Sequence, residues 1–77
     1  MNRQRRSMLK NILDKIETVK NLIENVCDEE QESIDNMPEN LQMSDRYAEG
    51  EENCDQLMEC CDMLDEISET INDIITK

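Results

Sequence analysis

LKNILDKIETVKNLIENV, residues 9–26, decides the fold, because its apolar side chains recur at alternating steps of three and four residues. This spacing keeps one stripe of a helix facing a neighbouring helix, as in a coiled coil. Leu13, Leu22 and Cys27 widen the stripe beyond what a two-stranded coiled coil needs, which is typical of a helix in a bundle. The predicted seam of this first helix consists of Leu9, Ile12, Ile16, Val19, Ile23 and Val26.

A second apolar stripe with the same spacing follows residue 44. Tyr47, Gly50 and Cys54 begin it. A glycine inside a helix costs about 1 kcal/mol relative to alanine, so Gly50 marks either a close contact between helices or a fraying point. The rest of the stripe, with its flanking residues, is Leu57, Cys60, Cys61, Leu64, Ile67, Ser68, Ile71, Ile74 and Ile75.

Pro38 separates the two stripes and disfavours a helical conformation at Met37. We predict a single domain, residues 1–77, made of a basic tail (1–6), a helix (7–34), a turn (35–43) and a second helix (44–76). Ser7 and Ser44 are the expected N-caps, because serine oxygens accept hydrogen bonds from the first free amides of a helix. A short connection makes two helices antiparallel neighbours. The predicted fold is therefore all-α, an antiparallel two-helix hairpin.

A chain of 77 residues buries too little surface to be stable with ease. Each stripe is also wider than the other helix can cover. A second copy is the simplest remedy, so we expect a homodimer, a four-helix bundle with an isologous interface. The expected oligomer seam combines both stripes: Leu9, Ile12, Ile16, Val19, Ile23, Val26, Leu57, Cys61, Leu64, Ile67, Ile71 and Ile74.

The charge of the chain is strongly uneven around a net value of −12. Residues 1–20 hold six Lys or Arg against two acids, net +4, whereas the segment from Glu24 to Asp55 holds twelve acids against Arg46, net −11. A hairpin places the basic start beside the acids at the end of the second helix, which we expect to compensate it. Such an acidic surface repels nucleic acids and anionic membranes, so a basic host protein is the expected partner. The candidate partner-binding residues are Asp28, Glu29, Glu30, Glu32, Asp45, Glu49, Glu51, Glu52 and Asp55.

No catalytic or cofactor-binding pattern is present, since the chain has no histidine, no nucleophile with a nearby base and no phosphate-binding loop. We therefore expect neither an enzyme nor a cofactor. The spacing of Cys27, Cys54, Cys60 and Cys61 is helical, which favours small buried hydrophobic residues over a zinc site or a functional disulfide. No signal peptide or membrane-spanning run is recognisable, so we expect a cytoplasmic protein of a bacterial host.

Residues 35–46, DNMPENLQMSDR, follow the pattern D-N-x-P-E-x-L-Q-x-S-x-R. In this stretch the chain resembles small acidic helical proteins of phages and prophages of Gram-positive bacteria, in which the pattern lies between an acid-rich helix and a second helix. The resemblance implies a phage-encoded origin and a hairpin whose turn carries the family's signature. It implies no activity.

Two hypotheses for the function follow. In the first, the acidic surface imitates a row of phosphates, binds a basic host protein such as one that binds nucleic acid, and inhibits it by occlusion. In the second, the chain is a structural or assembly homo-oligomer, and its acids serve only solubility. Salt-sensitive complexes with DNA-binding host proteins are expected under the first hypothesis alone.

Overall fold

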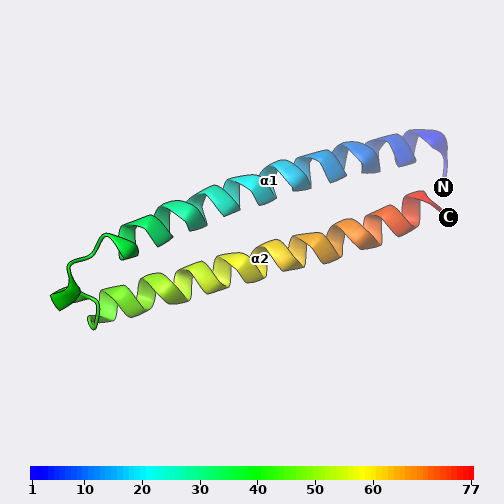
Figure 1. Cartoon of the computed structure of the whole chain (residues 1–77). Helices are drawn as coiled ribbons and strands as arrows, with labels where there is room; N and C mark the ends of the chain where they lie inside the picture. Colours follow the sequence, from blue (N-terminus) through cyan, green and yellow to red (C-terminus); the bar gives the residue numbers. More distant parts are fainter.

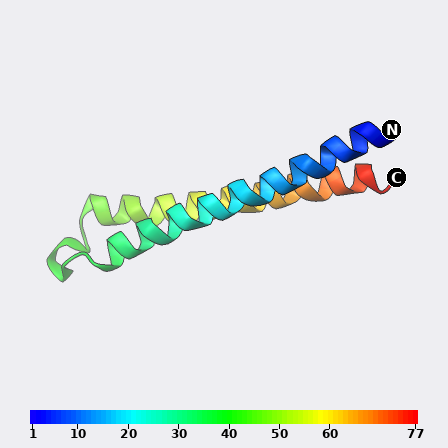
Figure 2. The ribbon, with the colours of Figure 1, turned by 90° about the horizontal axis from the view of Figure 1, so that it is seen from above.

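A computed structural model describes all 77 residues and shows two long helices joined by one tight turn. Helix α1 spans Arg3–Asp35, the short 3-10 helix η1 spans Glu39–Leu41 and helix α2 spans Asp45–Ile75. The long helices lie side by side in opposite directions, which brings the N- and C-termini together at one end (Figure 1). The view from above shows the same pair with the turn at the opposite end (Figure 2). The predicted all-α antiparallel hairpin is confirmed.

The start of α1 differs from the prediction. Asn2 caps the helix, because its side-chain oxygen accepts a hydrogen bond from the Arg5 N–H at 2.8 Å. Asparagine caps a helix as well as serine does, and Arg-Gln-Arg-Arg contains no residue that disfavours a helix. The prediction of a basic tail followed by a start at Ser7 is therefore wrong: the arginines form the first turn of α1.

The turn is held by short local hydrogen bonds. The Leu41 N–H donates to the Pro38 carbonyl at 2.8 Å, which closes η1. Ser44 caps α2 as expected, since its Oγ accepts from the Tyr47 N–H at 3.3 Å and donates to the Leu41 carbonyl at 2.6 Å. The connection therefore comes from capping and from the restricted backbone of proline, both of which are local properties of the sequence.

The α2 stripe lies against α1 as the spacing predicts. Gly50 decides the closest approach, because a Cβ added there would overlap the Ile34 Cγ2 and lie 3.1 Å from the Glu30 Oε1. Of the two interpretations of Gly50, the close helix contact is the correct one. The stripe residues that are buried or half-buried are Tyr47, Gly50, Cys54, Leu57, Cys61, Leu64, Ser68, Ile71, Ile74 and Ile75. The flanking residues Cys60 and Ile67 are exposed, so their prediction as seam residues is wrong within the single chain.

The predicted α1 seam is correct at alternate positions only. Leu9, Ile16 and Ile23 are half-buried, whereas Ile12, Val19 and Val26 are 42%, 46% and 53% exposed. Leu9, Ile16 and Ile23 belong to two neighbouring stripes of α1. The stripe that packs against α2 is the one that ends at Ile34, which is 1% exposed. The other stripe leads to Ser33, which has no comparable side chain to bury. The stripe that faces α2 is Leu9, Leu13, Ile16, Lys20, Ile23, Cys27, Glu30 and Ile34.

The core is narrow and lies between the middle of the hairpin and its turn. Its five buried residues are Cys27, Ile34, Gly50, Cys54 and Cys61. The molecule is a rod of 60 × 15 × 12 Å, so two helices alone form almost all of its thickness. Nothing in the fold covers the outer sides of either helix, and any function of this chain therefore resides on exposed helix surfaces.

Candidate interaction surfaces

The turn end of the rod carries the acidic surface predicted from the sequence. We call the segment from Glu24 to Asp55, with its twelve acids, the acidic lobe. Of the nine candidate partner-binding residues, all but Glu30 are exposed, and Glu30 is half-buried beside Gly50. No acid of the lobe forms an ion pair within the chain, because the single salt bridge joins Lys20 to Asp65. The lobe therefore presents uncompensated carboxylates to solvent.

The carboxylates form a collar around the rod. Asp28, Glu29 and Glu30 are consecutive residues of one helix, so successive side chains point about 100° apart. Glu51 and Glu52 are likewise adjacent on α2. Their distribution suits a partner that surrounds or grips the end of the hairpin better than one that reads a single straight row.

The field of the lobe acts on its only aromatic residue. Glu51 raises the pKa of Tyr47, first as a hydrogen-bond acceptor for the hydroxyl and second through its charge, and Asp35 adds to the effect. A negative environment raises the pKa of an acid because it disfavours a second negative charge. Tyr47 therefore stays neutral at physiological pH, and its hydroxyl is a hydrogen-bond donor to Glu51.

Three of the four cysteines pack between the helices, as predicted. The Cys27 thiol donates to the Cys54 carbonyl at a distance of 3.7 Å, and the Cys54 thiol donates to the Cys27 carbonyl at 3.6 Å. Burial raises the pKa of the Cys54 and Cys61 thiols, which favours the unreactive neutral form. Cys60 is exposed, all four thiols are free, and no three ligand-type side chains are grouped for a metal ion.

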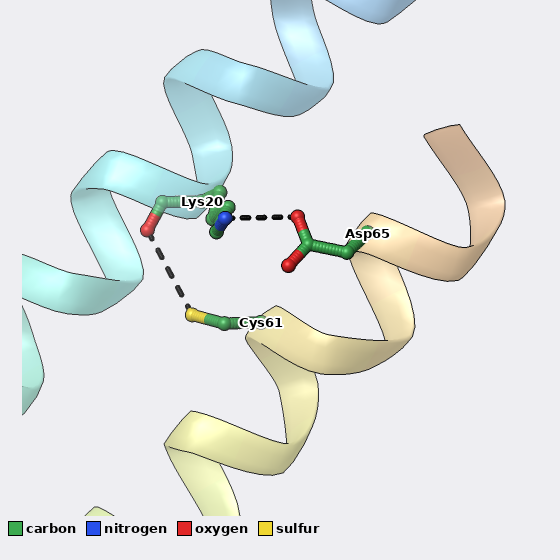
Figure 3. Close-up of polar contacts among 3 residues, drawn as sticks. All are labelled: Lys20, Cys61 and Asp65. Atoms are coloured by element: carbon green, nitrogen blue, oxygen red, sulfur yellow. Dashed lines mark hydrogen bonds and ion pairs between the residues drawn. The ribbon is translucent and has the colours of Figure 1, made fainter. Parts of the chain in front are cut away.

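The middle of the hairpin contains the only ion pair of the chain. Lys20 takes a seam position, yet its Nζ reaches the Asp65 Oδ1 at 2.8 Å (Figure 3). This hydrogen bond raises the pKa of Lys20. The Cys61 thiol approaches the Lys20 carbonyl at 4.0 Å in the same place. A lysine can occupy the seam because its long apolar stem packs while its charged end reaches the edge.

The basic end is less compensated than the sequence suggested. Lys20 apart, none of the cations in residues 1–20 lies within ion-pair distance of an acid. The Nε of Arg6 is buried without a hydrogen-bond partner. The expectation that acids of α2 neutralise this end therefore holds for one pair only, because most of those acids point outward from the rod. By net charge, the −5 of residues 56–77 still offsets the +4 of residues 1–20, so the compensation is by proximity and not by ion pairs. An open hollow at this end is lined by Arg3, Gln4, Arg6, Ser7, Met8 and Lys10.

A third surface, which the sequence interpretation merged with the seam, is apolar. Val26, Leu57 and Cys60 line one shallow hollow, so the exposed stripes of the two helices share a side of the rod. Steps of seven residues return to nearly the same side of a helix, which adds Ile12 and Val19 on α1. We call this surface the apolar flank and define it as Ile12, Val19, Leu22, Val26, Cys60, Met63 and Ile67, all exposed.

Comparison with protein-family models, with curated proteins and with solved structures found no match to this chain. Neither long helix is apolar enough over a sufficient length to cross a membrane. The exposed surface of the rod has three distinct parts: the acidic lobe at the turn, the cations of residues 1–20 and the apolar flank along one side.

Proposed function

We propose that this chain is a non-enzymatic, phage-encoded protein that acts in the cytoplasm of a bacterial host by binding a basic host protein through its acidic lobe. The observation that carries the proposal is the net charge of −11 over the lobe, with no ion pair inside it. Self-repulsion of this size costs stability, and solubility alone does not require its concentration at one end.

The chemistry of the lobe favours a partner that normally binds nucleic acid. Carboxylates on two rigid helices offer a dense array of negative charge at the tip of a rod only 15 × 12 Å across. A groove that accommodates a phosphate backbone is positively charged and accepts such a tip. Occupation of that groove excludes the nucleic acid, so the expected consequence is inhibition by occlusion.

The chain itself is not expected to bind nucleic acid or anionic lipid, because its net charge of −12 repels both. Five free cations at the termini are outnumbered by the acids of the whole molecule.

The experiment compares two variants with the same change in charge. The lobe variant carries Asp28→Asn, Glu29→Gln, Glu32→Gln, Glu49→Gln, Glu51→Gln and Glu52→Gln. The control carries Asp14→Asn, Glu59→Gln, Asp62→Asn, Glu66→Gln, Glu69→Gln and Asp73→Asn. All twelve positions are exposed, so both variants should fold.

Each chain is immobilised and exposed to a nuclease-treated lysate of a Gram-positive bacterium, and the proteins retained by the native chain are purified. The affinity of each is then measured at low and high salt. We expect the lobe variant to lose affinity by orders of magnitude and to lose its salt dependence, while the control binds as the native chain does. Competition by DNA for the same partner tests occlusion. Equal binding by the lobe variant refutes the proposal.

The alternative function is that of a structural or assembly homo-oligomer, and the exposed apolar flank favours it. In that case the native chain retains no host protein in a salt-sensitive manner. Neutralising the lobe then lowers solubility and changes nothing else.

A further inference from the structure

The apolar flank is centred on the middle of the hairpin. Helix α1 runs from Arg3 to Asp35, so Val19 is its central residue. Ile12 and Val26 lie seven residues to either side of it. Both are more than two-fifths exposed, as is Val19 itself. The Lys20–Asp65 ion pair shows that Asp65 of α2 lies opposite the centre of α1. Cys60 and Ile67 therefore lie on either side of this central position.

A surface centred in this way can pack on a copy of itself about a two-fold axis perpendicular to the rod. A residue that lies a given number of positions before Val19 then lies level with the residue the same number after it. Arg6 comes level with Glu32, and Lys10 comes level with Asp28. The rods overlap along their whole length, and the basic end of each copy lies beside the acidic lobe of the other.

Charge selects this orientation. Residues 1–20 carry net +4, residues 56–77 beside them carry net −5, and the lobe carries net −11. The antiparallel arrangement places the cations of α1 beside the lobe of the other copy and keeps the two lobes apart. A parallel arrangement places the two lobes side by side. Like-charge contacts of this kind are strongly unfavourable, whereas complementary ends steer and orient association.

The available area is sufficient. A face of 60 × 15 Å offers about 900 Å², and a standard interface buries roughly 800 Å² per partner. Exposed apolar side chains grouped on one side of a small protein mark an interaction surface. The opposite side of the rod, which carries the Lys20–Asp65 pair and a hollow lined by Leu13, Asp65, Ser68, Glu69 and Asn72, is more polar.

We propose that the apolar flank binds the same flank of a second copy of this chain, with the two hairpins antiparallel and the basic end of each beside the acidic lobe of the other. This proposal assigns the interface of the homodimer expected from the sequence to the apolar flank and makes the two hairpins antiparallel. The inference does not rest on binding to a host protein. Each end of the dimer keeps a strongly negative net charge, because the −5 of residues 56–77 offsets the +4 of residues 1–20, so the lobe remains available to a basic partner.

The first experiment tests the face. Light scattering of the native chain should give twice its mass of 9.1 kDa. The variant Val19→Lys/Ile67→Lys should give 9.1 kDa, since both changes place a charge in the proposed interface. The control Thr18→Lys/Asn25→Lys adds the same charge at two exposed positions on the outer side of α1 and should remain a dimer. A monomeric native chain, or a dimeric Val19→Lys/Ile67→Lys variant, overturns the proposal.

The second experiment tests whether the two hairpins are antiparallel. It uses the native chain, so its result does not depend on whether the lysine variant folds. Chains labelled with nitrogen-14 and nitrogen-15 are mixed, and lysines are joined to neighbouring carboxylates with a zero-length cross-linker. We expect mixed-isotope peptides that join Lys10 to acids of the lobe such as Asp28 and Glu32. Mixed-isotope peptides that join Lys10 only to Glu69 or Asp73 indicate parallel hairpins, and the absence of mixed-isotope peptides indicates a monomer. Either result overturns the proposal.

Discussion

The two halves of the hairpin pack differently. From the middle to the turn small facing residues such as Cys27, Gly50 and Cys54 are interspersed among large ones, and this half contains the buried residues of the chain. Towards the termini the facing residues are larger aliphatics such as Leu13 and Ile71, and they remain half-buried. Small side chains let two helices approach until they enclose what lies between them.

A large side chain between only two helices stays half-buried unless a small residue lets the partner helix close over it, as Gly50 does at Ile34, because a fully buried residue needs about six to twelve neighbours. The terminal half, which has the larger apolar side chains, therefore leaves them only half-buried. The turn half can therefore be stable within a single chain, whereas the side chains of the terminal half and of the apolar flank need a further packing partner to become buried.

The largest expected loss of stability comes from truncating the most buried residue of the turn half. Ile34→Ala should cost about 2–5 kcal/mol, the range for deleting a buried aliphatic side chain, because Ile34 is 1% exposed. Ile12→Ala, at a position 42% exposed, should cost less than about 1 kcal/mol at protein concentrations that keep the chain monomeric. Urea unfolding followed by circular dichroism measures both. Equal losses would show that Ile34 is no better enclosed than a residue of the apolar flank.

The next effect concerns the close approach at Gly50. Gly50→Ala adds a Cβ that overlaps Ile34 Cγ2, and overpacking of this kind costs about 1–3 kcal/mol. The better helix propensity of alanine returns about 1 kcal/mol, so a net loss is expected. In an Ile34→Ala background the added methyl group has room, and the same change should be neutral or stabilising. A gain in stability in the native background would contradict the close contact.

A smaller effect is expected from the buried thiols at alkaline pH. The folded-state pKa of Cys54 and of Cys61 is raised by burial, whereas unfolded thiols ionise near pH 8.5. The unfolded chain therefore loses these protons first. Their contribution to stability is complete below about pH 8.5 and is lost as pH rises through the folded-state pKa.

Denaturation midpoints at pH 7 and pH 10 measure this loss. Cys54→Ala/Cys61→Ala should be less stable at pH 7, but its stability should change less between the two pH values. Cys60→Ala, at an exposed position, is the control and should keep the native pH dependence. An unchanged slope in the double variant would exclude the thiols as its source.

The smallest effect is expected at the boundary between the halves. Asp65→Asn keeps an acceptor oxygen but removes the negative charge of the 2.8 Å ion pair with Lys20, and partly exposed pairs contribute little. Asp62→Asn makes the same change in charge at an exposed residue without an ion pair. At low salt Asp65→Asn should be slightly less stable than Asp62→Asn, and in about 1 M salt the difference should vanish. A difference that persists in high salt would indicate packing instead of charge.

Most of the fold and the position of the acidic lobe were predictable. On α2 a second stripe runs through Cys60, Ile67 and Ile74, but upstream it leads to Asn53. The stripe that faces α1 continues through Cys54 to Tyr47, so the sequence favoured it. The lobe follows from a short turn, which necessarily brings Glu24 and Asp55 to the same end. The start of α1 was missed because Asn2 and Ser7 are both good caps and local preference does not choose between them.

The apolar flank was not separable from the seam by spacing. Leu9, Ile16 and Ile23 belong to two stripes at once, one through Ile12 and one through Leu13. A lysine at position 20 argued against the stripe that the structure uses. Only the reach of its side chain to Asp65 across the helix pair makes that position acceptable.

The sequence by itself determined the two helices, their caps at the turn, their antiparallel order and the separation of charge along the rod, because each depends on neighbouring residues or on the length of the connection. The tertiary structure alone decided which of the two α1 stripes is enclosed. That choice depends on Ile34 meeting Gly50, a contact between residues from different helices whose fit is a matter of shape. The stripe left outside is the surface on which we expect a second copy to pack.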